Sequence, residues 1–361
     1  MGDEKQLHED RKMEHVKIIC EKGMQASRNW IDDVYLHPSA IPSIDPGDID
    51  TSCMLFGRKF DAPFYIAGMT GGHPKSKKIN EVLARACVKA KIPLGLGSQR
   101  VALDNDTLVE TYKVARDVSD DLFLIGNIGM SQLVKSKNPV VIAKKCVDMI
   151  KANALAIHFN KLQELVQPEG DRAFAKVMDI VEAVAYALKV PIILKEVGAG
   201  FSRSDFEILK NFRIGAVDVG GYGGTNFALV EAERVNEEKY PYTRNMGEVF
   251  KDCGIPTPVS VVFSKKYARI PTLATGGIRT GLDVVKMLCL GADMAGLAYP
   301  FLIACLNDIS SDATSIENCM KEIETIKAEI KIAMCMLNAK RVGDLGAAMV
   351  HMSQELLGWI D

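Results

Sequence analysis

Apolar segments of strand length recur along this chain from Pro63 onward, and segments with the apolar spacing of helices separate them. Eight segments have strand composition: 64–69, 92–96, 122–126, 154–158, 192–195, 216–219, 272–275 and 295–298. Strands that alternate with helices form a parallel sheet, and eight strand–helix units close into a barrel. The pattern therefore predicts an α/β fold, a (β/α)8 TIM barrel.

The intervening segments have helical periodicity. They are 77–91, 105–118, 139–153, 172–189, 204–211, 260–268 and 282–290. After the eighth strand, residues 316–337 have the spacing of helices that cover a barrel, and the last twenty residues are expected to add another helix.

Two regions do not follow the alternation. Residues 1–62 are expected to form an N-terminal arm and an irregular lead-in, with a strand or hairpin at 51–56, ahead of a barrel domain at 63–361. The interval from Val219 to Thr272 is too long for a simple crossover. It predicts an insertion or lid after strand six.

Bulk properties exclude several classes of partner. A formal net charge of −2 predicts no nucleic-acid or anionic-membrane partner, so any anion site must be local. The nine cysteines are scattered and form no C-x-x-C pair, which favours reduced thiols and a cytoplasmic location. The charged N-terminus does not resemble a signal peptide, and glycines, Asp293 and Pro300 interrupt the apolar stretch 287–306.

Glycine-containing turns follow the last two predicted strands. Thr275-Gly276-Gly277-Ile278-Arg279 precedes a helical segment, and Tyr299-Pro300 can open a short helix. Backbone N–H groups in such turns and at helix N-termini bind phosphate, and barrels place a phosphate site after strands seven and eight. Turn geometry alone also explains one Gly-Gly pair, but the arginine and the second turn favour the phosphate site.

Polar or glycine-rich residues also follow each of the first six predicted strands. Since catalytic groups of a barrel lie at the C-terminal ends of its strands, this clustering predicts an active site there. The segments are Met69–His73, Gly97–Arg100, Asn127–Gly129, His158–Glu164, Lys195–Gly198 and Asp218–Thr225.

Taken together and in order, these motifs resemble the flavin-dependent, type 2 isopentenyl diphosphate isomerases, particularly archaeal members, over nearly the whole chain. The motifs are Arg11-Lys12-x-Glu14-His15, Met69-Thr70-Gly71-Gly72, Gly97-Ser98-Gln99-Arg100, His158-x-Asn160-x-x-Gln163-Glu164 with Gly170-Asp171, Lys195-Glu196-Val197-Gly198, Gly223-Gly224-Thr225 and Gly276-Gly277-Ile278-Arg279. One departure is Asn226-Phe227, where many members have Ser or Thr and then Trp. It bears on the packing of the lid more than on chemistry.

The resemblance implies FMN across the barrel mouth. Its phosphate and ring would meet Met69, Thr70, Gly71, Ser98, Asn127, Lys195, Thr225, Gly277, Arg279, Ala298 and Tyr299. A lysine after strand five would stabilise the negative charge of reduced flavin near N1.

The resemblance further implies a substrate diphosphate with Mg²⁺. The substrate would be bound by Arg11, Lys12, His15, Ser98, Gln99, Arg100, His158, Asn160 and Gln163. Glu164 would be the metal ligand, because Mg²⁺ combines few carboxylates with phosphate oxygens and water.

The expected reaction is the isomerisation of isopentenyl diphosphate to dimethylallyl diphosphate by a 1,3-allylic proton shift. Reduced FMN would be the main acid and base, with His158 and Gln163 nearby and NADPH as reductant. The resemblance also implies a homo-oligomer, a tetramer or octamer, in which the arm folds over its own or a neighbouring barrel mouth.

The alternative is an FMN-dependent oxidoreductase of the hydroxy-acid oxidase or nucleotide dehydrogenase type, which shares the Gly-Gly-Ile-Arg turn. Such oxidases need a histidine base late in the barrel, and none lies between Val219 and Ala274. A nucleotide dehydrogenase would need a nucleophilic cysteine after strand six. Cys253 has only Lys251 nearby to lower its pKa, so it is interpreted as a bystander.

Overall fold

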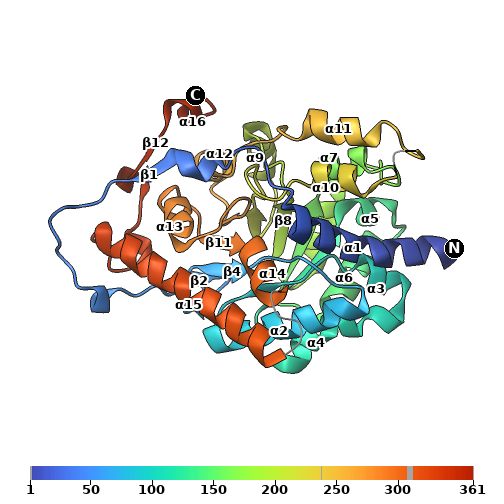
Figure 1. The fold of residues 1–361 in the computed structure, drawn as a ribbon, viewed down its shortest axis with the longest axis horizontal. Coiled ribbons are helices and arrows are strands. Elements are labelled where there is room, and N and C mark those ends of the chain that lie inside the picture. The colour runs from blue at the N-terminus through green and yellow to red at the C-terminus, as the bar shows by residue number, and fades with distance from the viewer. Residues whose placement is uncertain (1, 237, 307–311, 361) are drawn as a thin grey trace.

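The computed structural model describes residues 2–236, 238–306 and 312–360, with side chains from Lys12 onward except at Asp312, and confirms the predicted barrel. Eight parallel strands close in sequence order, and the last pairs with the first (Figure 1). They are β4 (Phe64–Ile66), β5 (Leu94–Gly95), β6 (Leu124–Gly129), β7 (Ala154–Phe159), β8 (Ile192–Glu196), β9 (Ala216–Asp218), β10 (Thr272–Ala274) and β11 (Met294–Leu297). Each falls within or beside a predicted strand.

Helices between the strands, and one after the last strand, surround the barrel. They are α2 (Pro74–Ala90), α3 (Arg100–Asp104), α4 (Glu110–Val118), α5 (Met130–Lys135), α6 (Pro139–Ile150), α7 (Lys161–Val166), α8 (Val177–Ala187), α9 (Arg203–Leu209), α12 (Thr257–Phe263) with the π-helical turn η4 (Ser264–Ala268), α13 (Gly281–Cys289) and α14 (Tyr299–Leu306). All seven predicted helices are present, with shifted ends. Helix α2 begins earlier than predicted because Pro74 suits a first turn that His73 Nδ1 caps at Lys75 N.

Residues that point into the barrel alternate with residues that pack against the helices, as strands require. The interior positions form an apolar cluster: Tyr65, Ala67, Ile125, Ala156, Ile193, Ala216, Leu273 and Met294. Cys53, Leu55 and Phe60 join this cluster from the antiparallel hairpin of β2 (Cys53–Leu55) and β3 (Arg58–Phe60). The hairpin expected near 51–56 therefore closes the N-terminal end of the barrel.

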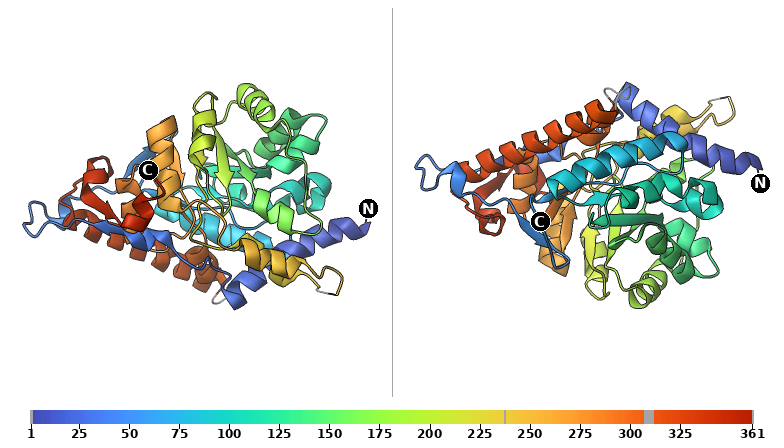
Figure 2. Two further views of the ribbon diagram at one scale, coloured as in Figure 1. Left: turned by 90° about the horizontal axis from the view of Figure 1, so that it is seen from above. Right: turned by 90° about the horizontal axis from the view of Figure 1, so that it is seen from below.

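The lead-in and the C-terminal tail pair with each other. Strand β1 (Val34–Leu36) is antiparallel to β12 (Val350–Met352), so the tail supplies a strand as well as the short helix α16 (Gln354–Leu357). The long helix α15 (Asp312–Met336) packs against α2, α13 and α14 (Figures 1 and 2). The predicted 316–337 segment is thus one helix on the outside of the barrel.

The arm and the insertion meet on the side of the molecule that lies away from the paired lead-in and C-terminal tail (Figure 2). The arm is a single helix, α1 (Gly2–Lys22), and the insertion contains α10 (Phe227–Arg234) and α11 (Thr243–Phe250). Helices α1 and α10 are in contact, and Val16 and Ile19 pack with Val230 and Leu302. No helix among the described residues is long and apolar enough to cross a membrane.

Candidate active site

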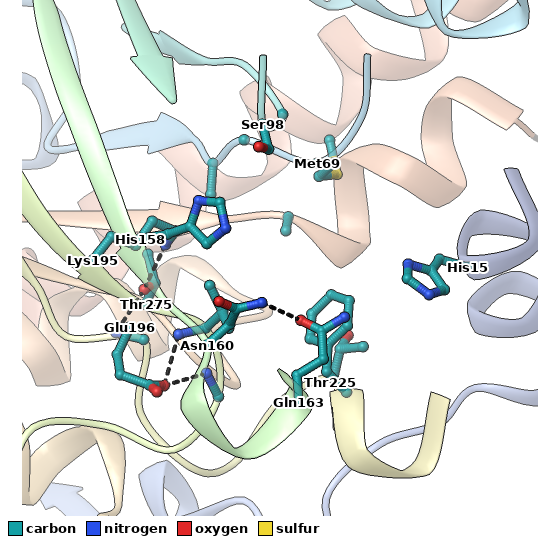
Figure 3. A pocket seen from close by; sticks show the side chains of 18 of the residues that line it. His15, Met69, Ser98, His158, Asn160, Gln163, Lys195, Glu196, Thr225 and Thr275 are labelled. Atoms are coloured by element: carbon teal, nitrogen blue, oxygen red, sulfur yellow. Dashed lines mark hydrogen bonds between the residues drawn. The ribbon is translucent and has the colours of Figure 1, made fainter. Parts of the chain in front are cut away.

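A pocket opens at the C-terminal end of the barrel, beneath α1 and α10 (Figure 3). It brings together most of the residues that the sequence predicted. Those that line it are Lys12, His15, Met69, Ser98, Arg100, Asn127, His158, Asn160, Gln163, Glu164, Lys195, Thr225, Gly277, Arg279, Ala298 and Tyr299. Within this chain the arm lies over the mouth of its own barrel, in contact with α10 and Leu302.

Three predicted residues, Gln99, Thr70 and Gly71, do not line the pocket, and a fourth, Arg11, is not described there. The Gln99 side chain is fully buried, donates to Cys146 O at 2.8 Å and accepts from Asn127 N, so it faces away from this pocket. Met69 lines the pocket but Thr70 and Gly71 do not, and the Thr70 hydroxyl contacts Ser76 Oγ at 2.9 Å. The Arg11 side chain lies outside the described part of the structure.

Glycines, an arginine and a helix terminus form one end of the pocket. Gly276 and Gly277 have φ values of 102° and 84°, and a Cβ at Gly277 would approach Gly223 O and Asn29 Oδ1 to 2.6 Å. The Arg279 guanidinium lies 4.9 Å from the Tyr299 ring, at the start of α14, and donates to Gln25 Oε1. Burial lowers the pKa of Arg279, but such a group remains protonated. This end has the charge and backbone shape that a phosphate requires.

A second group of cations lies on the same pocket. Arg100 Nη1 is 3.3 Å from Asp171 Oδ2, and Lys12 Nζ donates to Gly71 O, Ser98 O and the Tyr112 hydroxyl at 2.6–2.7 Å. Lys12 therefore anchors α1 to the strand ends as well as adding charge.

His158 is a neutral imidazole in this cationic surrounding. Its Nδ1 lies 2.8 Å from Asn127 Oδ1, and the Asn127 amide donates to Leu96 O, so Nδ1 carries the proton. Burial, followed by the charges of Lys195, Lys12 and Arg100, lowers the pKa of His158 to about 3. Nε2 is then a hydrogen-bond acceptor, and an anion in the pocket would favour its protonation.

Glu164 is a buried carboxylate at the pocket wall, with a donor on each oxygen. Oε1 accepts from Asn160 Nδ2 at 3.0 Å and Oε2 from the Asp171 amide at 2.6 Å. Each oxygen keeps a lone pair, so one metal–oxygen bond fits this geometry. No group of three or more His, Cys, Asp or Glu side chains able to hold a metal occurs within the described residues.

Glu196 is a second buried carboxylate on the pocket. Burial raises its pKa to about 7, against the effect of four backbone N–H groups, from Val197 to Gly200, that donate to Oε2. These bonds fix the loop after β8.

Glu231 is a functional candidate that the sequence did not reveal. It is fully buried on α10, where Oε1 accepts from Gln163 Nε2 at 2.7 Å and Oε2 from Arg234 Nε at 2.9 Å. His15 Nε2 lies 3.0 Å from Oε1, although off the direction of a hydrogen bond. Burial raises the pKa of Glu231, but His15, Arg234 and Gln163 outweigh it and lower the value to about 2. Glu231 is therefore an ionised carboxylate that accepts a hydrogen bond from the Gln163 amide.

The departure at Asn226-Phe227 has a structural role. Asn226 Oδ1 accepts from the N–H groups of Ala228 and Leu229 and so caps α10. The Phe227 ring packs edge-on against His15 with centroids 6.1 Å apart. These contacts join α10 to the arm.

Comparisons with known proteins show the family to which the chain is related. The FMN-dependent dehydrogenase family matches residues 13–106 and 101–352. A protein of Archaeoglobus fulgidus, named isopentenyl-diphosphate delta-isomerase, is 40% identical over 351 residues, 97% of this chain and 98% of its own length. Proteins of Methanosarcina mazei and Methanocaldococcus jannaschii with the same name are 39% and 37% identical, over 93% and 98% of this chain and 89% and 96% of their own.

Solved structures share the fold at low identity. A flavocytochrome b2 mutant with benzoylformate has a TM-score of 0.64 at 20% identity, over 90% of this chain and 77% of its own. Mandelate oxidase with (S)-2-phenylpropionate has a TM-score of 0.58 at 18% identity, over 91% and 88%. Because the chain is 37–40% identical to these archaeal proteins over nearly its full length, it belongs to the isopentenyl-diphosphate delta-isomerase family.

Proposed function

We propose that the protein binds FMN across the barrel mouth and isomerises isopentenyl diphosphate to dimethylallyl diphosphate by a 1,3-allylic proton shift. The observation that supports the proposal is the presence on one pocket of two separate groups of residues that can bind an anion. One group contains Gly277 and Arg279, and the other contains Arg100, Lys12 and His158. A phosphate-bearing cofactor and a diphosphate substrate together need two such groups.

The pocket residues fit FMN. Gly277, Arg279 and Tyr299 would hold its phosphate, with Thr225, Ala298 and backbone groups beside them, and Met69, Ser98, Asn127 and Lys195 would meet the ring. Gly276 and Gly277 leave room for a close approach to the backbone that a Cβ would block. Bound FMN, once reduced, supplies the main acid and base for the shift.

The second group would hold the substrate diphosphate. Arg100 suits bidentate contact with phosphate oxygens, and His158 would become a donor once the anion raises its pKa. Glu164 would add one carboxylate oxygen to a Mg²⁺ ion whose other ligands are diphosphate oxygens and water. Asn160 and the Asp171 amide orient that carboxylate.

The arm and α10 would exclude water from the reacting alkene. Val16 and Ile19 of the arm, Phe227 and Leu302 line an apolar cover over the mouth. Protonation of an alkene generates a carbocation-like state that water would trap, so such a cover would protect that state until a proton is lost. Gln163 lies at the pocket wall, where its amide donates to Glu231 and accepts from Asn160. These two hydrogen bonds would fix its orientation toward the substrate.

An FMN-dependent oxidoreductase is the second candidate. Its supporting observation is the barrel shared with flavocytochrome b2 and mandelate oxidase. Cys253 is exposed, beside a small pocket next to Phe227.

One experiment separates the two candidates. The FMN-loaded protein, reduced with dithionite under anaerobic conditions, is incubated with Mg²⁺ and isopentenyl diphosphate in D₂O. The isomerase yields dimethylallyl diphosphate that carries deuterium by NMR, while the flavin stays reduced and no further reductant is consumed. Consumption of NADPH in proportion to product, or full turnover with oxidised flavin, would overturn the proposal.

We further propose a reductant, an oligomeric state and a cellular location, on the basis of the family resemblance and the thiol content. NADPH is the external reductant, which anaerobic reduction by NADPH against NADH tests. The protein is a homo-oligomer, a tetramer or octamer, which light scattering tests. It acts in the cytoplasm without nucleic-acid or membrane partners, which cell fractionation tests.

A further inference from the structure

A buried carboxylate lies directly beneath the pocket. Asp218 ends β9 with 2% of its surface exposed, and its Cα is in register with that of Lys195 on β8. Asp218 Oδ2 lies 2.6 Å from Lys195 Nζ and accepts from the Tyr65 hydroxyl at 2.5 Å, while Oδ1 accepts from Thr275 Oγ1. The cluster of Tyr65, Lys195, Asp218 and Thr275 is called the floor cluster below.

Strand alternation explains why these four side chains meet. Ile193, Ala216 and Leu273 point into the barrel, so Lys195, Asp218 and Thr275, each two residues further along the chain, point the same way. Tyr65 reaches the same level from β4. The floor cluster is therefore a polar layer on top of the apolar barrel interior.

The protons of the floor cluster have defined positions. Thr275 Oγ1 accepts from Gly220 N–H at 3.0 Å, so its own proton goes to Asp218. The Lys195 ammonium has Asp218 and Thr275 as partners among the described residues, the second at 3.4 Å, and it lines the pocket. One ammonium proton is thus left to face the pocket, where Figure 3 shows Lys195 beside Thr275.

We propose that Asp218 is a positioning residue that aims the Lys195 ammonium at bound FMN and, by partly neutralising it, sets how strongly the pocket favours reduced over oxidised FMN. This inference rests on the FMN-binding part of the proposed function and not on the isomerase reaction. Tyr65 changes the same balance of charge, because its hydroxyl donates a hydrogen bond to the Asp218 carboxylate and so lowers the negative charge that faces Lys195.

The sign of each effect follows from electrostatics. Reduced FMN becomes an anion, and a positive charge close by in a buried site stabilises it. Removing the negative charge of Asp218 leaves Lys195 uncompensated and favours the reduced form. Removing the Tyr65 hydroxyl concentrates charge on Asp218, which offsets Lys195 more completely and disfavours the reduced form.

The test measures the midpoint potential of bound FMN by anaerobic titration with dithionite against a reference dye. Asp218→Asn should increase the affinity for reduced relative to oxidised FMN about tenfold, a rise of about 30 mV for a two-electron couple. Tyr65→Phe should change the ratio about threefold the other way, a fall of about 15 mV. Asp293→Asn is the matched control at the opposite end of the strands, where Asp293 accepts from Thr272 N, and it should leave the potential unchanged.

Opposite shifts distinguish charge tuning from structural damage, which would move both variants the same way. An unchanged or lower potential in Asp218→Asn overturns the inference. If that variant does not fold, Tyr65→Phe decides alone, and an unchanged or higher potential overturns it. A parent protein that binds no FMN would instead reject the proposed function, so the two failures are distinct.

Discussion

The backbone amide of Asp171 donates to Glu164 Oε2 at 2.6 Å, while the Asp171 carboxylate contacts Arg100 at 3.3 Å. One residue of the loop before α8 thus fixes both the expected metal ligand and an expected phosphate ligand. Lys135 and Gln132 hold the same carboxylate from α5. The loop between α7 and α8 therefore supports the proposed substrate site.

Replacement of Glu164 by Gln should raise the Mg²⁺ concentration needed for half-maximal activity at least tenfold. The amide keeps the shape of the side chain but lacks the charge that attracts the ion. The measurement is a Mg²⁺ titration of isomerase activity, with FMN content from the visible spectrum. Equal Mg²⁺ dependence in variant and parent would remove Glu164 from the metal site.

Replacement of Glu231 by Gln should lower kcat by about 100-fold, at the lower end of what proton-transfer groups contribute. The ionised Glu231 carboxylate accepts a hydrogen bond from Gln163, and a neutral amide in its place would hold the Gln163 side chain less firmly. The control is Glu233→Gln on the same helix, where Glu233 pairs with Lys22 at 2.5 Å. If both variants keep the parent kcat, Glu231 has no part in the reaction.

His158 should make the protein less stable as the pH falls. Its folded pKa of about 3 lies below the ordinary value of 6.5, so its contribution is complete above pH 6.5 and is lost as the pH falls toward 3. Between pH 7.5 and pH 5, the free energy of unfolding should fall about 2 kcal/mol more in the parent than in His158→Gln.

Urea unfolding at the two pH values measures this difference. His37→Gln, at an exposed histidine, is the control and should behave as the parent. A parent and His158→Gln with the same pH dependence would show that His158 is not held neutral.

Replacement of Lys12 by Met should loosen the arm, because three hydrogen bonds to the strand ends are lost. We expect KM for isopentenyl diphosphate to rise about tenfold and the arm to become sensitive to protease, each lost bond contributing about 1 kcal/mol or less after the arm reorganises. FMN content should not change. Lys17→Met, at an exposed position of the same helix, is the control, and a parent-like Lys12→Met would refute the anchoring role.

The sequence by itself determined the barrel, since the alternation of strand and helix is a local property of hydrophobic spacing. It also located the pocket, because chain order alone places every residue after a parallel strand at the same end of the barrel. Lys195, His158 and Arg279 were identified for that reason. A strand or hairpin was also expected near 51–56, and the structure has the hairpin of β2 and β3 there.

Tertiary structure alone decided which side chains face the pocket from loops and added helices. Gln99 follows β5 in a loop that has no fixed periodicity, and its side chain turns into the protein. Glu231 and Arg234 have the spacing of an exposed helical ion pair, and only the packing of α10 under the arm buries the carboxylate. Pairings such as β1 with β12 or Lys195 with Asp218 join segments distant in sequence, so strand register and chain closure determine them.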